Sequence, residues 1–127
     1  MTVKSILGNT RRADISFFSS GRIDIMSRIA DALCLQEGDV IDIMNGDREF
    51  YLYIRVRAAD TCGRHEARCY PSKRGGRHFR TYCRRLSSAI LKECGQSYRA
   101  NLAAGTIVDI NGTKAIHIIT RNSIIHA

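Results

Sequence analysis

An internal repeat constrains this chain more than any other feature of its sequence. Residues 35–43 read Leu-x-x-Gly-x-aliphatic-aliphatic-Asp-Ile, and residues 102–110 read the same. An Asn-Gly pair follows each segment almost at once, at positions 45–46 and 111–112. Asn-Gly between apolar runs is a strong hairpin signal, because both residues tolerate positive φ. A pattern that recurs over this many positions is typical of a duplicated structural unit.

Each half predicts the same order of elements: two strands, a short helix, a Leu-x-x-Gly turn and a hairpin of two more strands. The predicted strands around these turns are residues 13–18 and 49–56 in the first half, and 66–70 and 113–120 in the second. Apolar side chains at helical spacing mark the two helices: Ile29, Ala32 and Leu33 in the first half, Leu86, Ala89 and Ile90 in the second. We expect Ser27 to cap the first helix with its hydroxyl, and residues 92–101 to form an extra loop.

The fold class that follows is mostly β (α+β). One half is too short to bury its own apolar faces. The two units, about residues 13–57 and 64–120, are therefore expected to share one small β-barrel with pseudo-two-fold symmetry, in a single domain over residues 1–127. Because both units lie in one chain, we expect a monomer or a weak homodimer. No apolar run reaches the roughly 18 residues of a membrane helix, so no membrane partner is predicted.

The segment 21–43, with its Gly-Arg pair, short helix and Leu-x-x-Gly-Asp turn, resembles the SpoVT/AbrB (MazE-like) swapped-hairpin domain family. The resemblance covers residues 15–54 and recurs more faintly over residues 64–120. In that family, two chains each contribute a strand–strand–helix–hairpin unit to an interlocked barrel, and most members are transcription regulators or antitoxins that bind DNA. The resemblance implies a fused pseudo-dimer that binds DNA, and Arg22 and Arg28 match basic positions of the family.

The charge distribution indicates the same class of partner. The net charge is +8, and residues 55–85 hold ten Lys or Arg against two acidic residues, whereas residues 1–54 carry a net −2. A solvated face kept for solubility would also be basic, but like charges this concentrated repel unless a polyanion relieves them. The residues expected to bind nucleic acid, DNA in the first place, are Arg22, Arg28, Lys73, Arg74, Arg77, Arg80, Arg84 and Arg85.

Aromatic side chains are interleaved with these arginines. Phe79 and Tyr82 would offer stacking surfaces to unpaired bases, but a strand with its arginines on one face favours burial of both rings on the other. Two alternatives to a DNA-binding regulator stay open. One is a protein-interaction module of antitoxin type, and the other is a single-stranded nucleic-acid or RNA-binding accessory protein of a mobile element.

No enzyme and no cofactor are predicted. The sequence lacks a P-loop, a dinucleotide fingerprint, Gly-x-Ser-x-Gly and His-Glu-x-x-His, and the repeat-related Asp42 and Asp109 lie inside predicted strands. Cys62, His65 and Cys69 are residue types that bind zinc, but there is no Cys-x2-Cys pair and His65 to Cys69 is predicted to be a strand, so no metal is expected. Five cysteines without a signal-peptide pattern favour reduced thiols and a cytoplasmic location.

Overall fold

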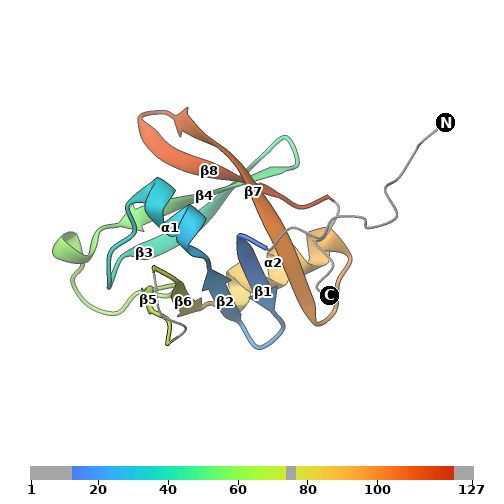
Figure 1. The fold of residues 1–127 in the computed structure, drawn as a ribbon, viewed down its shortest axis with the longest axis horizontal. Coiled ribbons are helices and arrows are strands. Elements are labelled where there is room, and N and C mark those ends of the chain that lie inside the picture. The colour runs from blue at the N-terminus through green and yellow to red at the C-terminus, as the bar shows by residue number, and fades with distance from the viewer. Residues whose placement is uncertain (1–12, 74–76, 122–127) are drawn as a thin grey trace.

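Eight strands and two helices make up the part of the chain that the computed structural model describes, residues 13–73 and 77–121 (Figure 1). The strands are β1 Ile15–Phe18, β2 Arg22–Ile25, β3 Val40–Gly46, β4 Glu49–Val56, β5 Tyr70–Pro71, β6 Phe79–Tyr82, β7 Arg99–Ile110 and β8 Thr113–Ile119. The helices are α1 Ser27–Leu33 and α2 Arg84–Cys94, and a 3-10 turn covers Ala58–Asp60. The predicted mostly β class is confirmed.

All the described strands belong to one antiparallel sheet in the order β3-β4-β8-β7-β1-β2-β6-β5. The sheet curls into a half-barrel, and the long strand β7 joins its two parts by pairing first with β1 and then with β8 (Figure 1). The two edges of the sheet also meet. The amide of Gly38 donates to the carbonyl oxygen of Cys69 at 2.7 Å, and the amide of Cys69 donates to the backbone carbonyl oxygen of Asp39 at 2.8 Å. The segment before β5 therefore lies along the start of β3.

The core lies between the curled sheet and the two helices. Alternate residues of the strands point into it, as the period-two pattern predicts. The largest fully buried strand side chains include Ile15, Phe17, Ile23, Ile25, Leu52, Leu102 and Ile118. α2 packs against β1 and β7 and adds Ile90, whereas α1 packs against β8 and adds Ile29. Within the described residues, neither helix is long and apolar enough to cross a membrane.

The start of α1 is held by a side chain that is distant in the sequence. Ile29 and Leu33 are buried at helical spacing, as predicted. The prediction that Ser27 caps this helix is wrong, because the cap position is Met26, which makes no side-chain cap bond. Instead, the amide of Ser27 donates to Nδ1 of His78 at 3.1 Å. The imidazole thus satisfies one of the amides that a helix leaves without a partner in its first turn.

The two hairpin turns are built differently. The turn between β7 and β8 lies at residues 111–112, with φ of 52° and 84°, as predicted. The turn predicted at residues 45–46 is wrong, because both belong to β3 and residues 47–48 make the turn, with φ of 51° and 63°. This register pairs the buried Leu52 with Ile43 on one side and with Ile116 on the other. Packing across three strands therefore overrides the local preference of Asn-Gly.

The predicted strand at residues 66–70 is also wrong. Only Tyr70 enters β5, and the residues before it form a turn in which Ala67 has a φ of 59°. An isolated bridge between Arg68 and Val40 is the remaining strand-like pairing of this stretch. A left-handed residue in the middle breaks the alternation of side chains that a strand requires.

The region between α2 and the end of β7 departs from the repeat pattern. The predicted loop at residues 92–101 is shorter, because α2 continues to Cys94, Gly95 ends it with a φ of 67°, and β7 begins at Arg99. Residues 102–105 do not form a Leu-x-x-Gly turn but lie inside β7, where the register with β8 shifts between positions 104 and 107. Leu102 is fully buried and pairs with Ile15, so the sheet holds this segment extended.

Candidate nucleic-acid interface

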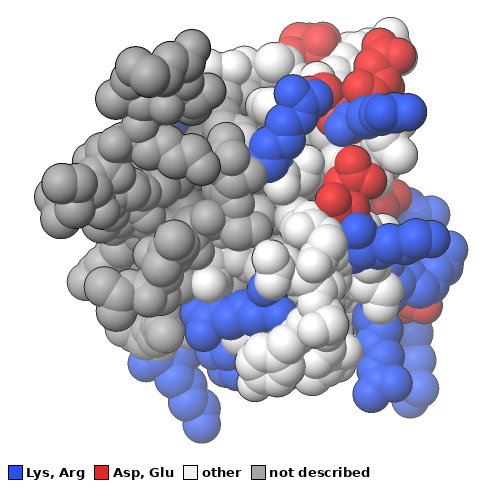
Figure 2. Space-filling view, turned by 90° about the vertical axis from the view of Figure 1, so that its right-hand side faces the viewer, with Lys and Arg blue, Asp and Glu red and all other residues white. Residues whose placement is uncertain are grey.

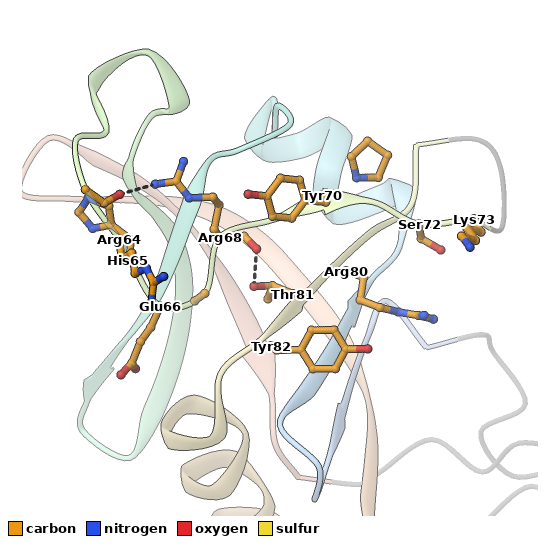
Figure 3. A pocket seen from close by; sticks show the side chains of 13 residues that line it. Arg64, His65, Glu66, Arg68, Tyr70, Ser72, Lys73, Arg80, Thr81 and Tyr82 are labelled. Atoms are coloured by element: carbon orange, nitrogen blue, oxygen red, sulfur yellow. Dashed lines mark hydrogen bonds between the residues drawn. The ribbon is translucent and has the colours of Figure 1, made fainter.

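A groove with a volume of about 790 Å³ runs along β5 and β6 (Figure 3). One wall is the turn that precedes β5, and the other is the outward face of β6. The lining residues that matter below are Arg64, Arg68, Lys73, Arg80, Tyr70 and Tyr82. A carboxylate, that of Glu66, also lines it, so the groove carries a clear excess of positive charge.

Backbone and hydroxyl groups position the cationic wall. Arg68 donates one nitrogen to Oγ1 of Thr61 at 3.3 Å and another to the carbonyl oxygen of Gly63 at 3.2 Å. Its own carbonyl oxygen accepts a bond of 2.7 Å from Oγ1 of Thr81, which ties the turn to β6 (Figure 3). Because the partners of the guanidinium are neutral, its charge remains available to an anion.

Two smaller hollows extend the groove past Glu66. One, of about 330 Å³, is lined by Arg84 and Arg85 at the start of α2, and the other, of about 250 Å³, by Arg55 on β4 and again by Arg85. Glu66 lines all three hollows. We call the combined surface the basic groove, and its seven cationic residues are Arg55, Arg64, Arg68, Lys73, Arg80, Arg84 and Arg85.

The basic groove brings together half of the residues predicted to bind nucleic acid. Lys73, Arg80, Arg84 and Arg85 all line it. Arg74 lies outside the described residues. Arg55, Arg64 and Arg68 were not predicted from the sequence as binding residues. The charge excess of residues 55–85, to which all three belong, could have identified them.

Three predicted residues lie apart from the lining of the groove and are paired with carboxylates. Arg28 contacts Asp14 at 2.8 Å and also donates to the carbonyl oxygen of Ala104 at 2.9 Å. Arg77 pairs with Asp31 and donates to the carbonyl oxygen of Leu35 at 3.3 Å. These two arginines connect α1 and the segment that follows it to other parts of the fold.

Arg22 is the third. Its guanidinium carbon lies 4.0 Å from the ring centroid of Phe18, and its Nη2 lies 3.5 Å from Asp24. Its Nε is buried and has no hydrogen-bond partner. The residue therefore packs on the sheet surface beside the groove, with one of its five N–H donors turned away from solvent.

Arg80 is the member of the basic groove that is held by a carboxylate. Its Nε donates to Oδ1 of Asp24 at 2.7 Å, and this bond is the largest of the effects that raise the pKa of Arg80. Burial opposes the increase. Asp24 itself is buried, so it fixes the guanidinium of Arg80 against the sheet, and Arg80 is one of the residues that line the groove.

The aromatic residues of β6 divide between the core and the groove. Phe79 is 6% exposed, which confirms its predicted burial, but Tyr82 is 62% exposed, so the prediction that it is a core residue is wrong. The two residues are three positions apart, and a strand of period two must point them to opposite faces. Tyr70, which the sequence analysis did not select, is 51% exposed and lines the groove beside Tyr82.

The zinc-type residues do not converge. Cys62 is exposed, Cys69 is fully buried, and Nε2 of His65 lies 3.1 Å from the carbonyl oxygen of Cys62. Burial raises the pKa of the Cys69 thiol to about 12, which disfavours the thiolate that a metal needs. The predicted strand from His65 to Cys69 is a turn. Across residues 13–73 and 77–121, no group of three or more His, Cys, Asp or Glu is placed to hold a metal ion.

Charges of the two signs are partly separated on the surface. On the face drawn in Figure 2, Lys and Arg side chains gather along the lower and right-hand edges, and Asp and Glu side chains gather mainly toward the upper right. Lys and Arg side chains also lie among the acidic ones at the upper right, so on this face one sign prevails only along the lower edge.

Comparison of the chain with protein-family models, with curated proteins and with solved structures gives no match in any of the three. The function is therefore inferred from the side chains of the basic groove.

Proposed function

We propose that this chain is a DNA-binding protein that contacts phosphates through the basic groove, and that it regulates transcription as the AbrB-like family does. The observation that carries the proposal is how few of the seven cationic side chains form an ion pair within the protein. Among the described residues, Arg80 alone of the seven forms an ion pair. Six unneutralised cations around one concave surface repel each other, and phosphate groups relieve that repulsion while releasing counterions.

The position of Arg84 and Arg85 supports an anionic partner independently. Both lie in the first turn of α2, which contains no acidic residue and has no side-chain cap. Positive charges at the amino end of a helix oppose its dipole and typically cost about 0.3–1 kcal/mol each. A phosphate at this end would interact favourably with the arginines and with the positive end of the helix dipole. The arrangement lowers stability in the free protein and suits a bound anion.

The strand pairing supports the fused pseudo-dimer that the family resemblance implies. The alignment of the two halves that equates their observed hairpin turns, Asp47 with Asn111, also places Leu52 on Ile116, and these two residues face each other across β4 and β8. Two equivalent strands that pair antiparallel about a two-fold axis must have equivalent residues at the centre of their ladder. β2 and β6, each of which precedes a helix, pair in the same antiparallel manner.

The proposal predicts a specific effect of charge reversal. We expect the triple variant Lys73→Glu, Arg84→Glu, Arg85→Glu to bind duplex DNA more weakly and to reduce the slope of log affinity against log salt concentration by about three. Its thermal midpoint should stay level or rise, because glutamates suit the amino end of α2. The measurement is fluorescence anisotropy at several salt concentrations, with duplexes of several sequences.

A second triple variant serves as the control, because it changes the net charge by the same amount as the first. Arg48, Lys92 and Lys114 are exposed, have no ion-pair partner among the described residues and do not line the basic groove. Their reversal to Glu should leave the salt slope nearly unchanged. Equal losses in both triples would refute the groove as the binding surface. Failure of the wild-type protein to bind any nucleic acid at low salt would refute the function and favour an acidic protein partner.

A further inference from the structure

Two exposed tyrosines share one face of the sheet with an oriented arginine. Tyr70 on β5 is the direct cross-strand partner of Arg80 on β6, and Tyr82 follows Arg80 by two positions. Side chains at these positions point to the same side of a sheet. In Figure 3, the two rings lie one above the other with Thr81 between them, and the side chain of Arg80 extends to one side; both rings line the groove.

Packing within the protein does not account for this exposure. The inward residues of β6, Phe79 and Thr81, are buried, so the strand already supplies its share of the core. The large hydrophobic side chains that stay exposed among the described residues are Tyr70, Tyr82, Tyr98 and Ile107. Two of these four line a single groove, and aromatic rings left open in a concave surface are typical of a binding site.

The cations around the rings are arranged as a rim. Arg64 and Arg68 lie on the wall formed by the turn before β5, and Lys73 lies beyond the end of β5 (Figure 3). Arg80 is fixed by its bond to Asp24, and in Figure 3 its guanidinium lies beside the rings, on the same side of them as Lys73. A strand of nucleic acid that crosses the groove would therefore meet positive charge on both sides and aromatic faces in the middle.

This combination selects for unpaired bases. In a duplex, the faces of the bases are stacked on each other and cannot reach a tyrosine ring, so the rings would contribute nothing to binding. In a single strand each base has a free face, and stacking on an aromatic side chain is worth enough to change affinity several-fold or more per base. A tyrosine hydroxyl can also donate to a phosphate, and the Tyr→Phe variants separate that contact from stacking.

We propose that the basic groove binds single-stranded DNA and stacks unpaired bases on Tyr70 and Tyr82. The proposal rests on one part of the proposed function, the contact of the cationic rim with phosphates, and it does not rest on regulation through duplex DNA. It adds the form of the nucleic acid, which the charges do not specify. It also gives the exposed rings of β5 and β6 a function, whereas the binding of duplex DNA would give them none.

The test uses the full chain and a labelled oligothymidylate of about 15 nucleotides, in the size range of known single-strand sites. The wild type should bind it more tightly than a duplex of equal length. Tyr70→Ala and Tyr82→Ala should each weaken binding by about five- to a hundred-fold, without changing the salt slope, because the phosphate contacts remain. Tyr70→Phe and Tyr82→Phe keep the ring and should bind nearly as the wild type does.

Tyr98→Ala is the matched control, because Tyr98 is 70% exposed but does not line the groove. It should bind as the wild type does, and thermal midpoints should confirm that all variants fold. Wild-type affinity in both alanine variants, or a preference for the duplex, would overturn the proposal. If the triple variant of Lys73, Arg84 and Arg85 still lost binding in either case, the proposed function would stand. The same measurement with an oligouridylate compares single-stranded RNA with single-stranded DNA. Tighter binding of the RNA would overturn the choice of DNA.

Discussion

Asp24 and Arg80 face each other at the centre of the β2–β6 ladder, where Nε of Arg80 donates to Oδ1 of Asp24 at 2.7 Å. Arg22 reaches the other oxygen of the same carboxylate at 3.5 Å. One buried negative charge therefore separates two arginines on the sheet face beside the basic groove. The carboxylate holds both guanidinium groups in place and also withdraws part of their charge from a nucleic acid.

The substitution Asp24→Asn should have opposite effects on stability and on binding. We expect the free energy of unfolding to fall by about 1–3 kcal/mol, because two half-buried arginines lose their charged partner. Affinity for nucleic acid should rise, because both cations become available to phosphates. Urea unfolding and anisotropy measure the two effects. Asp31→Asn is the control, because the Asp31–Arg77 pair is exposed and should contribute less than about 1 kcal/mol. Equal losses of stability in the two variants would contradict this account.

Gly21 is predicted to tolerate no side chain. Its φ is +97°, and a Cβ there would lie 2.8 Å from Cγ and 3.2 Å from the backbone nitrogen of Arg84. Gly21→Ala should therefore combine backbone strain of about 1–2 kcal/mol with displacement of the first residue of α2. Gly63→Ala is the control, since Gly63 has a φ of +79° but open space around it. The thermal midpoint should fall further for Gly21→Ala, and similar shifts would show that the contact with Arg84 does not matter.

The pair of Glu49 and His117 predicts a pH effect on stability. Nε2 of His117 lies 2.6 Å from Oε2 of Glu49, and this hydrogen bond is the largest of the effects that lower the pKa of Glu49 below its ordinary value of 4.5. A carboxyl whose pKa is lower in the folded state contributes stability above its unfolded pKa, and this contribution is lost as the pH falls through the folded pKa.

Between pH 4.5 and more acidic conditions, the wild type should therefore lose thermal stability more steeply than Glu49→Gln. The measurement is a series of melting curves in buffers of constant ionic strength. Arg121, whose Nη2 lies 3.2 Å from Oε1 of Glu49, contributes to the same lowering, so Arg121→Gln should flatten the profile less. Parallel profiles for the wild type and Glu49→Gln would exclude this contribution.

A fragment of residues 1–58 should fail to fold as a monomer. Three of its four strands lose a neighbour, because β1 pairs with β7, β2 with β6 and β4 with β8. We expect the fragment to be unfolded or to self-dimerise, whereas the full chain should be a monomer or a weak dimer. Size-exclusion chromatography with light scattering, together with circular dichroism, distinguishes these states. A stable, well-folded monomeric fragment would rule out the fused barrel.

The features that could be predicted from the sequence are those that local patterns decide. The turn at residues 111–112 follows from backbone freedom, and the burial of Ile29, Leu33 and Ile90 follows from helical spacing. The predicted core position Ala89 is wrong, because Ala89 is exposed and α2 buries Ser87 and Leu91 instead. The turn at residues 47–48 and the imidazole of His78 on the amide of Ser27 depend on strand register and on distant contacts. No pattern within one segment carries that information.

The candidate site divides in the same way. The charge excess of residues 55–85 located the basic groove in the sequence, but it did not distinguish the cations of the groove from Arg77, which is paired with Asp31. The exposure of Tyr82 was available from its spacing to Phe79, since a strand points these residues to opposite faces. The exposure of Tyr70 was not, because it depends on a two-residue strand that follows an irregular turn.

The pairing of Ile15 with Leu102 has a consequence for how the chain is made. β1 to β4 leave the ribosome first, with one edge of β1, of β2 and of β4 still open, and β7 and β8 are synthesised much later. Contacts between residues so distant in sequence slow folding, because the loop must close before the contact stabilises it. Open strand edges on a nascent chain are sites where neighbouring chains pair wrongly. The yield of native protein should therefore depend on the interval between synthesis of β4 and synthesis of β7.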